Sequence, residues 1–181
     1  TTWPALAGRA AKLANALAKR GVRRGERIAT LAWNSIPHLE LYYGVSSMGA
    51  IMHTVNPRLF PGQILYILKD AADTHLFVDP TVLPVVEGLA DELPDTLKAI
   101  VIMGGPGDIP AETKLRGRFE LLDQDSLLAP ESDRYAWPKL DERSASSLCY
   151  TSGTTGDPKG VLYSHRSTVL HGLASLAPDV F

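Results

Sequence analysis

The spacing of apolar residues changes several times along the chain, and each change predicts a new element. Near the start, Leu6, Ala10, Leu13 and Leu17 recur at the spacing of one buried helix face. Gly21 follows this pattern and is a natural helix stop. The same reasoning predicts helices over residues 3–20, from a cap at 34–35 to about 48, over 61–70, over 81–93, and from 164 or 165 onward.

Short apolar runs separate these helices. They are bounded by glycine, proline or polar residues, and they are too short to be buried helices, so each predicts a strand. Asn56-Pro57, for example, ends one such run. The predicted strands cover residues 26–33, 49–55, 75–79, 99–103, 146–150 and 160–163.

One long stretch, Asp108–Asp141, shows neither the helical spacing of apolar residues nor the short apolar runs of the predicted strands. It holds Pro110, Gly117, Pro130 and Pro138 among many charged residues. Such punctuation is typical of loops, so we expect an irregular surface excursion here.

Alternating strands and helices predict an α/β fold, with a mostly parallel sheet and helices on both faces. Ligands of such sheets bind beyond the carboxyl ends of the strands. The helix ending near Met48 is apolar on most sides, so we expect it to be buried. We expect Trp33, Tyr42 and Tyr43 to belong to the core and not to a ligand platform.

Composition and charge narrow the class of protein. The chain has 181 residues, of which 45% are hydrophobic and 21% charged, so it can bury a core. A formal net charge of −2 gives no electrostatic case for nucleic acid or an acidic membrane. There is no apolar run of the ~20 residues that a membrane-spanning helix needs. The single cysteine, Cys149, fits a reducing compartment, and we expect a cytoplasmic protein.

The segment Thr151–Gly160, between two predicted strands, carries the most chemistry. Gly153 and Gly156 permit positive φ and a close approach of the backbone to a ligand, where successive N–H groups can surround an anion. Lys159 adds one mobile positive charge suited to phosphate. Further hydroxyl donors are Thr151, Ser152, Thr154 and Thr155.

This segment differs from the familiar phosphate motifs. The P-loop of classical NTPases needs Gly-x-x-x-x-Gly-Lys-Ser/Thr, with the lysine opening a helix. Here Lys159 lies three residues beyond Gly156 and leads into a predicted strand. The dinucleotide fingerprint Gly-x-Gly-x-x-Gly is not matched either. An ordinary hairpin turn rarely combines so many hydroxyls, glycines and a lysine, so the residues favour a phosphate-binding loop between two strands.

The run Tyr150–Val161 resembles the signature of the adenylate-forming superfamily, which includes acyl-CoA synthetases, firefly luciferase and nonribosomal peptide synthetase adenylation domains. Upstream, Met48–Leu59 resembles the family's G-A-x-x-x-x-x-N-P segment. Val161–Ser167, with Asn56–Phe60, is most similar to bacterial medium- and long-chain fatty acyl-CoA ligases. The resemblance covers essentially the whole chain.

The resemblance implies a fatty acyl-CoA ligase that uses ATP, Mg²⁺ and CoA as small-molecule partners. The fatty carboxylate would attack the α-phosphorus of ATP, and CoA would then displace AMP from acyl-AMP. His165 would line the acyl-substrate pocket, whereas Arg166 suits a structural ion pair equally well. We interpret His53 and His75 as structural. The residues that would bind the β- and γ-phosphates of ATP are Thr151, Ser152, Gly153, Thr154, Thr155, Gly156 and Lys159.

The resemblance also implies that residues 1–181 are the N-terminal portion of the AMP-binding domain. The family's adenine-binding segment, ribose-binding aspartate, Mg²⁺-linked glutamate, hinge and C-terminal lid with its catalytic lysine all follow the loop. We therefore assign no certain catalytic residue and no metal ligand here, and we expect this polypeptide alone to be inactive. Its sheet edges would be unpaired, and a homo-oligomer would cover them.

Two alternatives stay open. The first is another acid-activating, adenylate-forming enzyme that acts on an aryl or amino acid. The second is a non-catalytic nucleotide-binding fragment.

Overall fold

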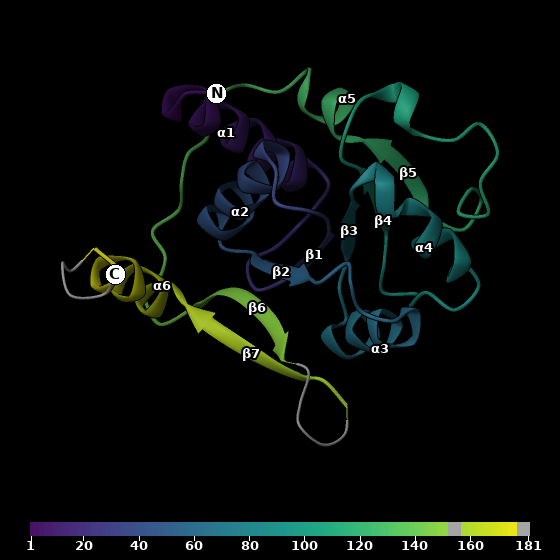
Figure 1. Cartoon of the computed structure of the whole chain (residues 1–181). Coiled ribbons are helices and arrows are strands. Elements are labelled where there is room, and N and C mark those ends of the chain that lie inside the picture. Colours follow the sequence, from purple (N-terminus) through teal and green to yellow (C-terminus); the bar gives the residue numbers. More distant parts are fainter. Residues whose placement is uncertain (152–156, 177–181) are drawn as a thin grey trace.

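The computed structural model describes residues 1–151 and 157–176. Strands in this part form a seven-stranded sheet in the order β5-β4-β3-β1-β2-β6-β7 (Figure 1). Neighbouring strands are parallel except β6 and β7, which are antiparallel. The mostly parallel α/β sheet predicted from the sequence is thereby confirmed. The strands are β1 (Arg27–Leu31), β2 (Ile51–Val55), β3 (His75–Val78), β4 (Ala99–Ile102), β5 (Glu120–Asp123), β6 (Ala145–Thr151) and β7 (Lys159–Ser164).

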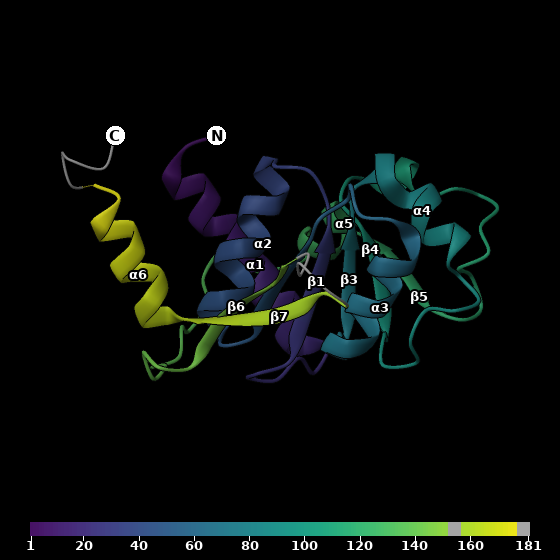
Figure 2. The same cartoon turned by 60° about the horizontal axis from the view of Figure 1, so that its bottom comes forward.

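Helices cover both faces of the central strands, as Figures 1 and 2 show. One face carries α1 (Trp3–Lys19), α2 (Ile36–Met48) and α5 (Gln124–Leu128). The other carries α3 (Pro61–Ala71) and α4 (Leu83–Gly88). The remaining helices are α6 (His165–Ala174) and the short 3-10 turns Pro80–Val82 and Pro106–Asp108.

The two hydrophobic clusters follow from the alternation of side chains along the strands. In β3, Leu76 and Val78 pack under α3 and α4, whereas Phe77 between them packs under α1 and α2. Side chains of a strand point to opposite faces in turn, so a strand buried on both sides is apolar throughout. This is why the continuous apolar runs of the sequence predict the central strands well.

Local signals set the path from α2 into β2. The side chain of Ser35 accepts a hydrogen bond from the backbone N–H of His38 at the start of α2. At its end, Gly49 has φ +94°, a left-handed conformation that glycine adopts without strain. The chain turns there and enters β2 directly.

Two predicted element boundaries are wrong. The stretch Asp108–Asp141 is not irregular throughout, because it contains the edge strand β5 and the helix α5. β5 is only four residues long and alternates too briefly to show a period. The helix predicted over 81–93 is also shorter, since a 3-10 turn precedes α4 and α4 ends at Gly88.

The prediction that α2 is buried on most sides is wrong as well. Leu41 and Val45 are fully buried, but Tyr43 on the opposite side is 45% exposed. Trp33, which precedes α2, is 40% exposed, and of the three aromatics only Tyr42 packs against the core. A helix on an outer layer needs one apolar stripe, so extra apolar residues face outward. Within the described ranges, no helix is both long enough and apolar enough to span a lipid bilayer.

Candidate functional site

The hairpin of β6 and β7 brings Thr151 and Lys159, at the described ends of the candidate segment, to the carboxyl edge of the parallel strands. β6 is parallel to β2, with His53 opposite Leu148 and Thr54 opposite Cys149. The carboxyl end of β6, at Thr151, therefore lies on the same edge as the carboxyl ends of β1 and β2. This is the edge where open α/β sheets bind their ligands. β7 then returns antiparallel from Lys159 (Figure 2).

Two candidate phosphate-binding residues form the base of the hairpin. Thr151 stands opposite Lys159 in the ladder, and its hydroxyl donates to the Lys159 carbonyl over 3.5 Å. Both residues are exposed, whereas Pro158 beside them is buried. The structure thus brings these two candidates together at the edge of the sheet. The other candidates, Ser152, Gly153, Thr154, Thr155 and Gly156, lie outside the described residues.

Tyr150, which immediately precedes Thr151, ties the hairpin to α3. Its hydroxyl donates a hydrogen bond of 2.6 Å to Oδ2 of Asp70 in the last turn of α3. Its ring crosses Gly160 on β7, where an added Cβ would lie 3.1 Å from Cζ of the ring. Burial, and then the carboxylate of Asp70, raise the pKa of the Tyr150 phenol, which stays protonated as a donor.

A buried pair lies beneath this tyrosine. Nδ1 of His53 is 2.8 Å from Oδ2 of Asp73, and both side chains are fully buried. Because a carboxylate accepts, Nδ1 of His53 is the donor. Nε2 of His53 is buried and has no hydrogen-bond partner among the described residues. Burial raises the pKa of Asp73, and its hydrogen bond with His53 opposes that shift.

These contacts agree with a structural role for His53. The described residues include no group of three or more His, Cys, Asp or Glu side chains that could hold a metal ion. Cys149, which precedes Tyr150 on β6, is half-buried, and its Sγ lies 3.2 Å from Oγ1 of Thr54 on β2.

His165 opens α6, directly after β7. Ser164 caps this helix by accepting from the backbone N–H of Ser167. The imidazole of His165 has a buried Nε2 without a hydrogen-bond partner in the described ranges, and burial lowers its pKa. It is therefore neutral near neutral pH. Arg166 pairs with Glu142 over 2.8 Å, on the protein surface.

A cavity of about 760 Å³ lies at the carboxyl ends of β1 and β2. After β1 the chain crosses to the face of α2, and after β2 it crosses to the face of α3, so the two connections leave the paired strands towards opposite faces of the sheet. Such a switch point leaves a crevice. The Arg58 guanidinium lies 5.3 Å from the Trp33 ring centre at its rim. The lining residues are Ala32, Trp33, Asn34, Ser35, His38, Leu39, Tyr42, Thr54, Val55, Asn56, Pro57 and Arg58.

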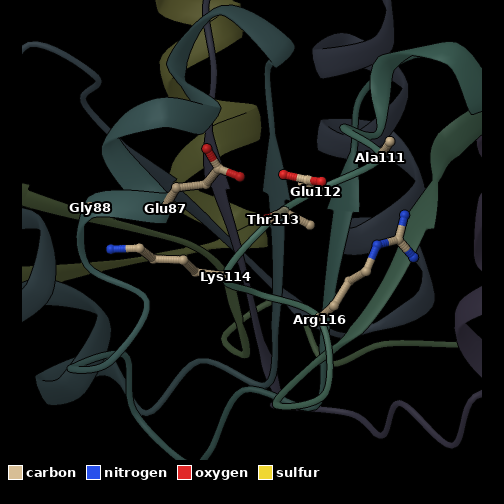
Figure 3. A pocket seen from close by; sticks show the side chains of 7 residues that line it. All are labelled: Glu87, Gly88, Ala111, Glu112, Thr113, Lys114 and Arg116. Atoms are coloured by element: carbon tan, nitrogen blue, oxygen red, sulfur yellow. The ribbon is translucent and has the colours of Figure 1, made fainter.

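A second hollow, of about 680 Å³, lies towards the opposite end of the sheet. Figure 3 shows Glu87 of α4 and Glu112 of the loop before β5, together with the basic side chains of Lys114 and Arg116 from the same loop. The charges that line this hollow are of both signs. The hollow also lies far from β6 in the strand order, so it is separate from the hairpin. None of the candidate residues lines it.

Sequence reasoning missed Tyr150, Asp70 and Asp73 as parts of this site. Tyr150 was visible only as one letter of the family signature. The two aspartates stand near the end of a helix, where the chain alone suggests solvent contact. Their position near a helix C-terminus, which disfavours negative charge, is the one signal that marks them.

Known proteins resemble the chain over nearly its full length. The 3-methylmercaptopropionyl-CoA ligase of Ruegeria pomeroyi is 51% identical over 99% of this chain and 32% of that protein. The medium-chain-fatty-acid–CoA ligase of Ectopseudomonas oleovorans is 48% identical over 98% of this chain and 32% of its own length. The chain thus spans about a third of the length of these curated relatives.

Solved structures agree on the fold. The anthranilate CoA ligase AuaEII, in complex with anthranoyl-AMP, superposes with a TM-score of 0.82 at 30% identity, over 93% of this chain and 30% of that one. A long-chain-fatty-acid–CoA ligase from Archaeoglobus fulgidus reaches 0.79 at 22% identity, over 95% and 32%. The family described as AMP-binding enzyme matches residues 1–179. With that match over nearly every residue, the chain belongs to the AMP-binding enzyme family.

Proposed function

We propose that the intact protein carrying this chain activates an aliphatic carboxylic acid with ATP and transfers the acyl group to CoA. The observation that carries this proposal is the segment Thr151–Gly160 of an AMP-binding family chain, which joins β6 to β7 at the carboxyl edge of the sheet. Residues 1–181 would be the N-terminal portion of the AMP-binding domain. The remaining catalytic groups and the lid would come from the rest of the protein.

This segment would not itself form a covalent bond in the reaction. The acid's carboxylate oxygen attacks the α-phosphorus of ATP, the bond to the bridging oxygen breaks, and pyrophosphate leaves. Lys159 and the hydroxyl of Thr151 would stabilise the negative charge that grows on that leaving group. The CoA thiolate then attacks the acyl carbon of acyl-AMP and releases AMP.

Mg²⁺ would enter with ATP. Lys159 is a cation and suits phosphate oxygens and not a metal ion, so the nucleotide's phosphates would hold most of the metal's coordination. His165 would form part of the acyl-substrate pocket. Its neutral imidazole at the start of α6 can face a carboxylic acid without forming an ion pair that would hinder attack.

The acid is the least defined partner. The relatives between 43% and 51% identical are named for 3-methylmercaptopropionate, medium-chain and long-chain fatty acids, all of them aliphatic, whereas the relative named for benzoate is 32% identical. They support an aliphatic acid for this protein. An ATP–pyrophosphate exchange panel with 3-methylmercaptopropionate, C6–C16 fatty acids, benzoate and amino acids would test this. Exchange only with the aromatic or amino acids would contradict it.

A pair of lysine variants tests the role of the hairpin. In the intact protein, Lys159→Ala should lower the exchange rate by roughly 10²-fold, the effect of losing one donor at a leaving group. Lys114→Ala is the matched control, because Lys114 is also exposed but lies in the hollow at the other end of the sheet. Equal rates for the two variants would exclude a role for Lys159.

The isolated 181-residue polypeptide tests the division of labour. We expect no pyrophosphate exchange from it under conditions in which the intact protein turns over. Binding of ATP without turnover would favour the alternative that the isolated polypeptide is a non-catalytic nucleotide-binding fragment. Clear turnover would contradict the proposed division.

A further inference from the structure

Two carboxylates at the C-terminal end of α3 each hold an aromatic ring of a neighbouring strand. Asp70 accepts from the hydroxyl of Tyr150 on β6, over 2.6 Å. Asp73 accepts from Nδ1 of His53 on β2, over 2.8 Å. The two rings lie 5.3 Å apart at 44° to each other. We name these four side chains, Asp70, Tyr150, His53 and Asp73, the carboxylate–aromatic row.

The C-terminal end of a helix is an unfavourable place for a carboxylate that has no partner. The C-terminal end of a helix carries partial negative charge, so an aspartate there is repelled. Asp73 is also fully buried, and a buried charge costs free energy unless it is paired. Each carboxylate has a partner, Tyr150 for Asp70 and His53 for Asp73, and each pair fixes the position of an aromatic ring.

The row fixes both strands of the hairpin. Tyr150 stands opposite Gly160 in the ladder, and its ring reaches over Gly160 to Asp70. Thr151 follows Tyr150, and Lys159 precedes Gly160. A shift of the Tyr150 ring would therefore move the two described candidate ligands together.

The ring of His53, on the neighbouring strand β2, packs against the ring of Tyr150. His53 is held by both carboxylate oxygens of Asp73, at 2.8 and 3.0 Å, so its ring cannot rotate without losing them. Tyr150 also packs against the apolar cluster that includes Leu148. The tyrosine thus has a rigid base on β2 and a polar anchor on α3.

We propose that Tyr150, anchored by Asp70, is a positioning residue that holds Thr151 and Lys159 in place for the phosphates of ATP. The inference rests on the proposed function and adds to it a group outside the family signature, Asp70. It acts through Thr151 and Lys159 and does not itself touch the nucleotide.

The test uses the intact protein, four single variants and one double variant. Tyr150→Phe removes only the hydroxyl, and Asp70→Ala removes its acceptor. Asp70→Asn keeps an acceptor oxygen and is the rescue variant. Tyr163→Phe on β7 is the control, since no hydrogen bond of its hydroxyl occurs in the described ranges.

We expect Tyr150→Phe and Asp70→Ala to raise the KM for ATP on the order of fivefold, the effect of one lost hydrogen bond. The maximal rate should also fall, because Thr151 and Lys159 would stabilise charge that grows on the leaving group, whereas the KM for the acid should stay within about twofold. Asp70→Asn and Tyr163→Phe should match the wild type. The double variant Tyr150→Phe/Asp70→Ala should be no worse than Asp70→Ala, since both remove the same bond.

A purely structural role would give another pattern. If both variants melt at lower temperature while the KM for ATP is unchanged, the inference is wrong. Calorimetric titration with inorganic pyrophosphate provides a readout that needs no turnover. If the wild type shows no ATP–pyrophosphate exchange with any acid, the proposed function fails. Weaker pyrophosphate binding by Tyr150→Phe than by the wild type would still support the positioning role, and equal binding would exclude it.

Discussion

Tyr150 and Gly160 face each other across β6 and β7, and the tyrosine ring fills the space that a side chain at position 160 would need. In Gly160→Ala the new Cβ would lie 3.1 Å from Cζ of a ring that Asp70 holds in place. We expect a loss of about 1–2 kcal/mol in unfolding free energy, as overpacking causes. Thermal unfolding would measure it.

A second glycine provides the control for that experiment. Gly172 lies in α6 with nothing within 4 Å of an added Cβ. Gly172→Ala should leave stability unchanged or raise it by up to ~1 kcal/mol, because alanine favours a helix. If both variants behave alike, Tyr150 is free to move and is not anchored.

The crossing of α1 and α2 depends on Gly44. A Cβ at this position would lie 2.8 Å from Cδ2 of Leu13 and 3.0 Å from the carbonyl oxygen of Ala10. Gly44→Ala should therefore destabilise the protein by about 1–3 kcal/mol despite the better helix propensity of alanine. Chemical denaturation of Gly44→Ala, Leu13→Ala and the double variant would test this. The double variant should lose less than the sum of the two, because Leu13→Ala vacates the space.

The buried pair of Asp73 and His53 should be sensitive to the loss of either partner. Asp73→Ala leaves the Nδ1–H of His53 buried without an acceptor, and we expect a cost of about 3 kcal/mol. Asp73→Asn keeps an acceptor oxygen and should cost clearly less. Urea unfolding near neutral pH gives both values. A loss below ~1 kcal/mol for Asp73→Ala would mean that water satisfies the histidine.

His75 should make the protein acid-sensitive. Burial, and then the nearby Lys98, lower the pKa of His75 to about 4 in the folded state. The unfolded histidine titrates near ~6.5, so between these values the unfolded chain binds more protons and stability falls as the pH falls. The full contribution is present above ~6.5, and about 3 kcal/mol is lost by pH ~4. His75→Gln should flatten this part of a stability–pH curve, and an unchanged slope would contradict the assignment.

The hairpin and the central strands could be predicted from sequence because their signals are local. β7 begins at Lys159 and α6 begins at His165, within a residue of the predicted positions. Strand β5 could not be predicted, since its pairing with β4 is decided by tertiary contact and not by its own four residues. The partial exposure of Trp33 likewise depends on the path of the chain between β1 and α2, which local sequence does not determine.

The polar contacts of the site were the least predictable part. Asp70 and Tyr150 are 80 residues apart, and no periodicity links them. Glu40 and Gln124 meet in the core in the same way, 84 residues apart. Such pairs follow from strand order, which local patterns do not determine, whereas the signature around Thr151 is contiguous.

The strand order also has a consequence for how the molecule assembles in time. β6 lies beside β2, yet Thr54 and Cys149 are 95 residues apart. Closing a loop of that length costs about 4 kcal/mol of chain entropy, whereas β1, β2 and β3 are joined by much shorter connections. During synthesis β2 therefore stays an open edge until β6 emerges. We expect the hairpin to dock last, and pulse-labelling hydrogen exchange would find the amides of β6 protected after those of β1 and β3.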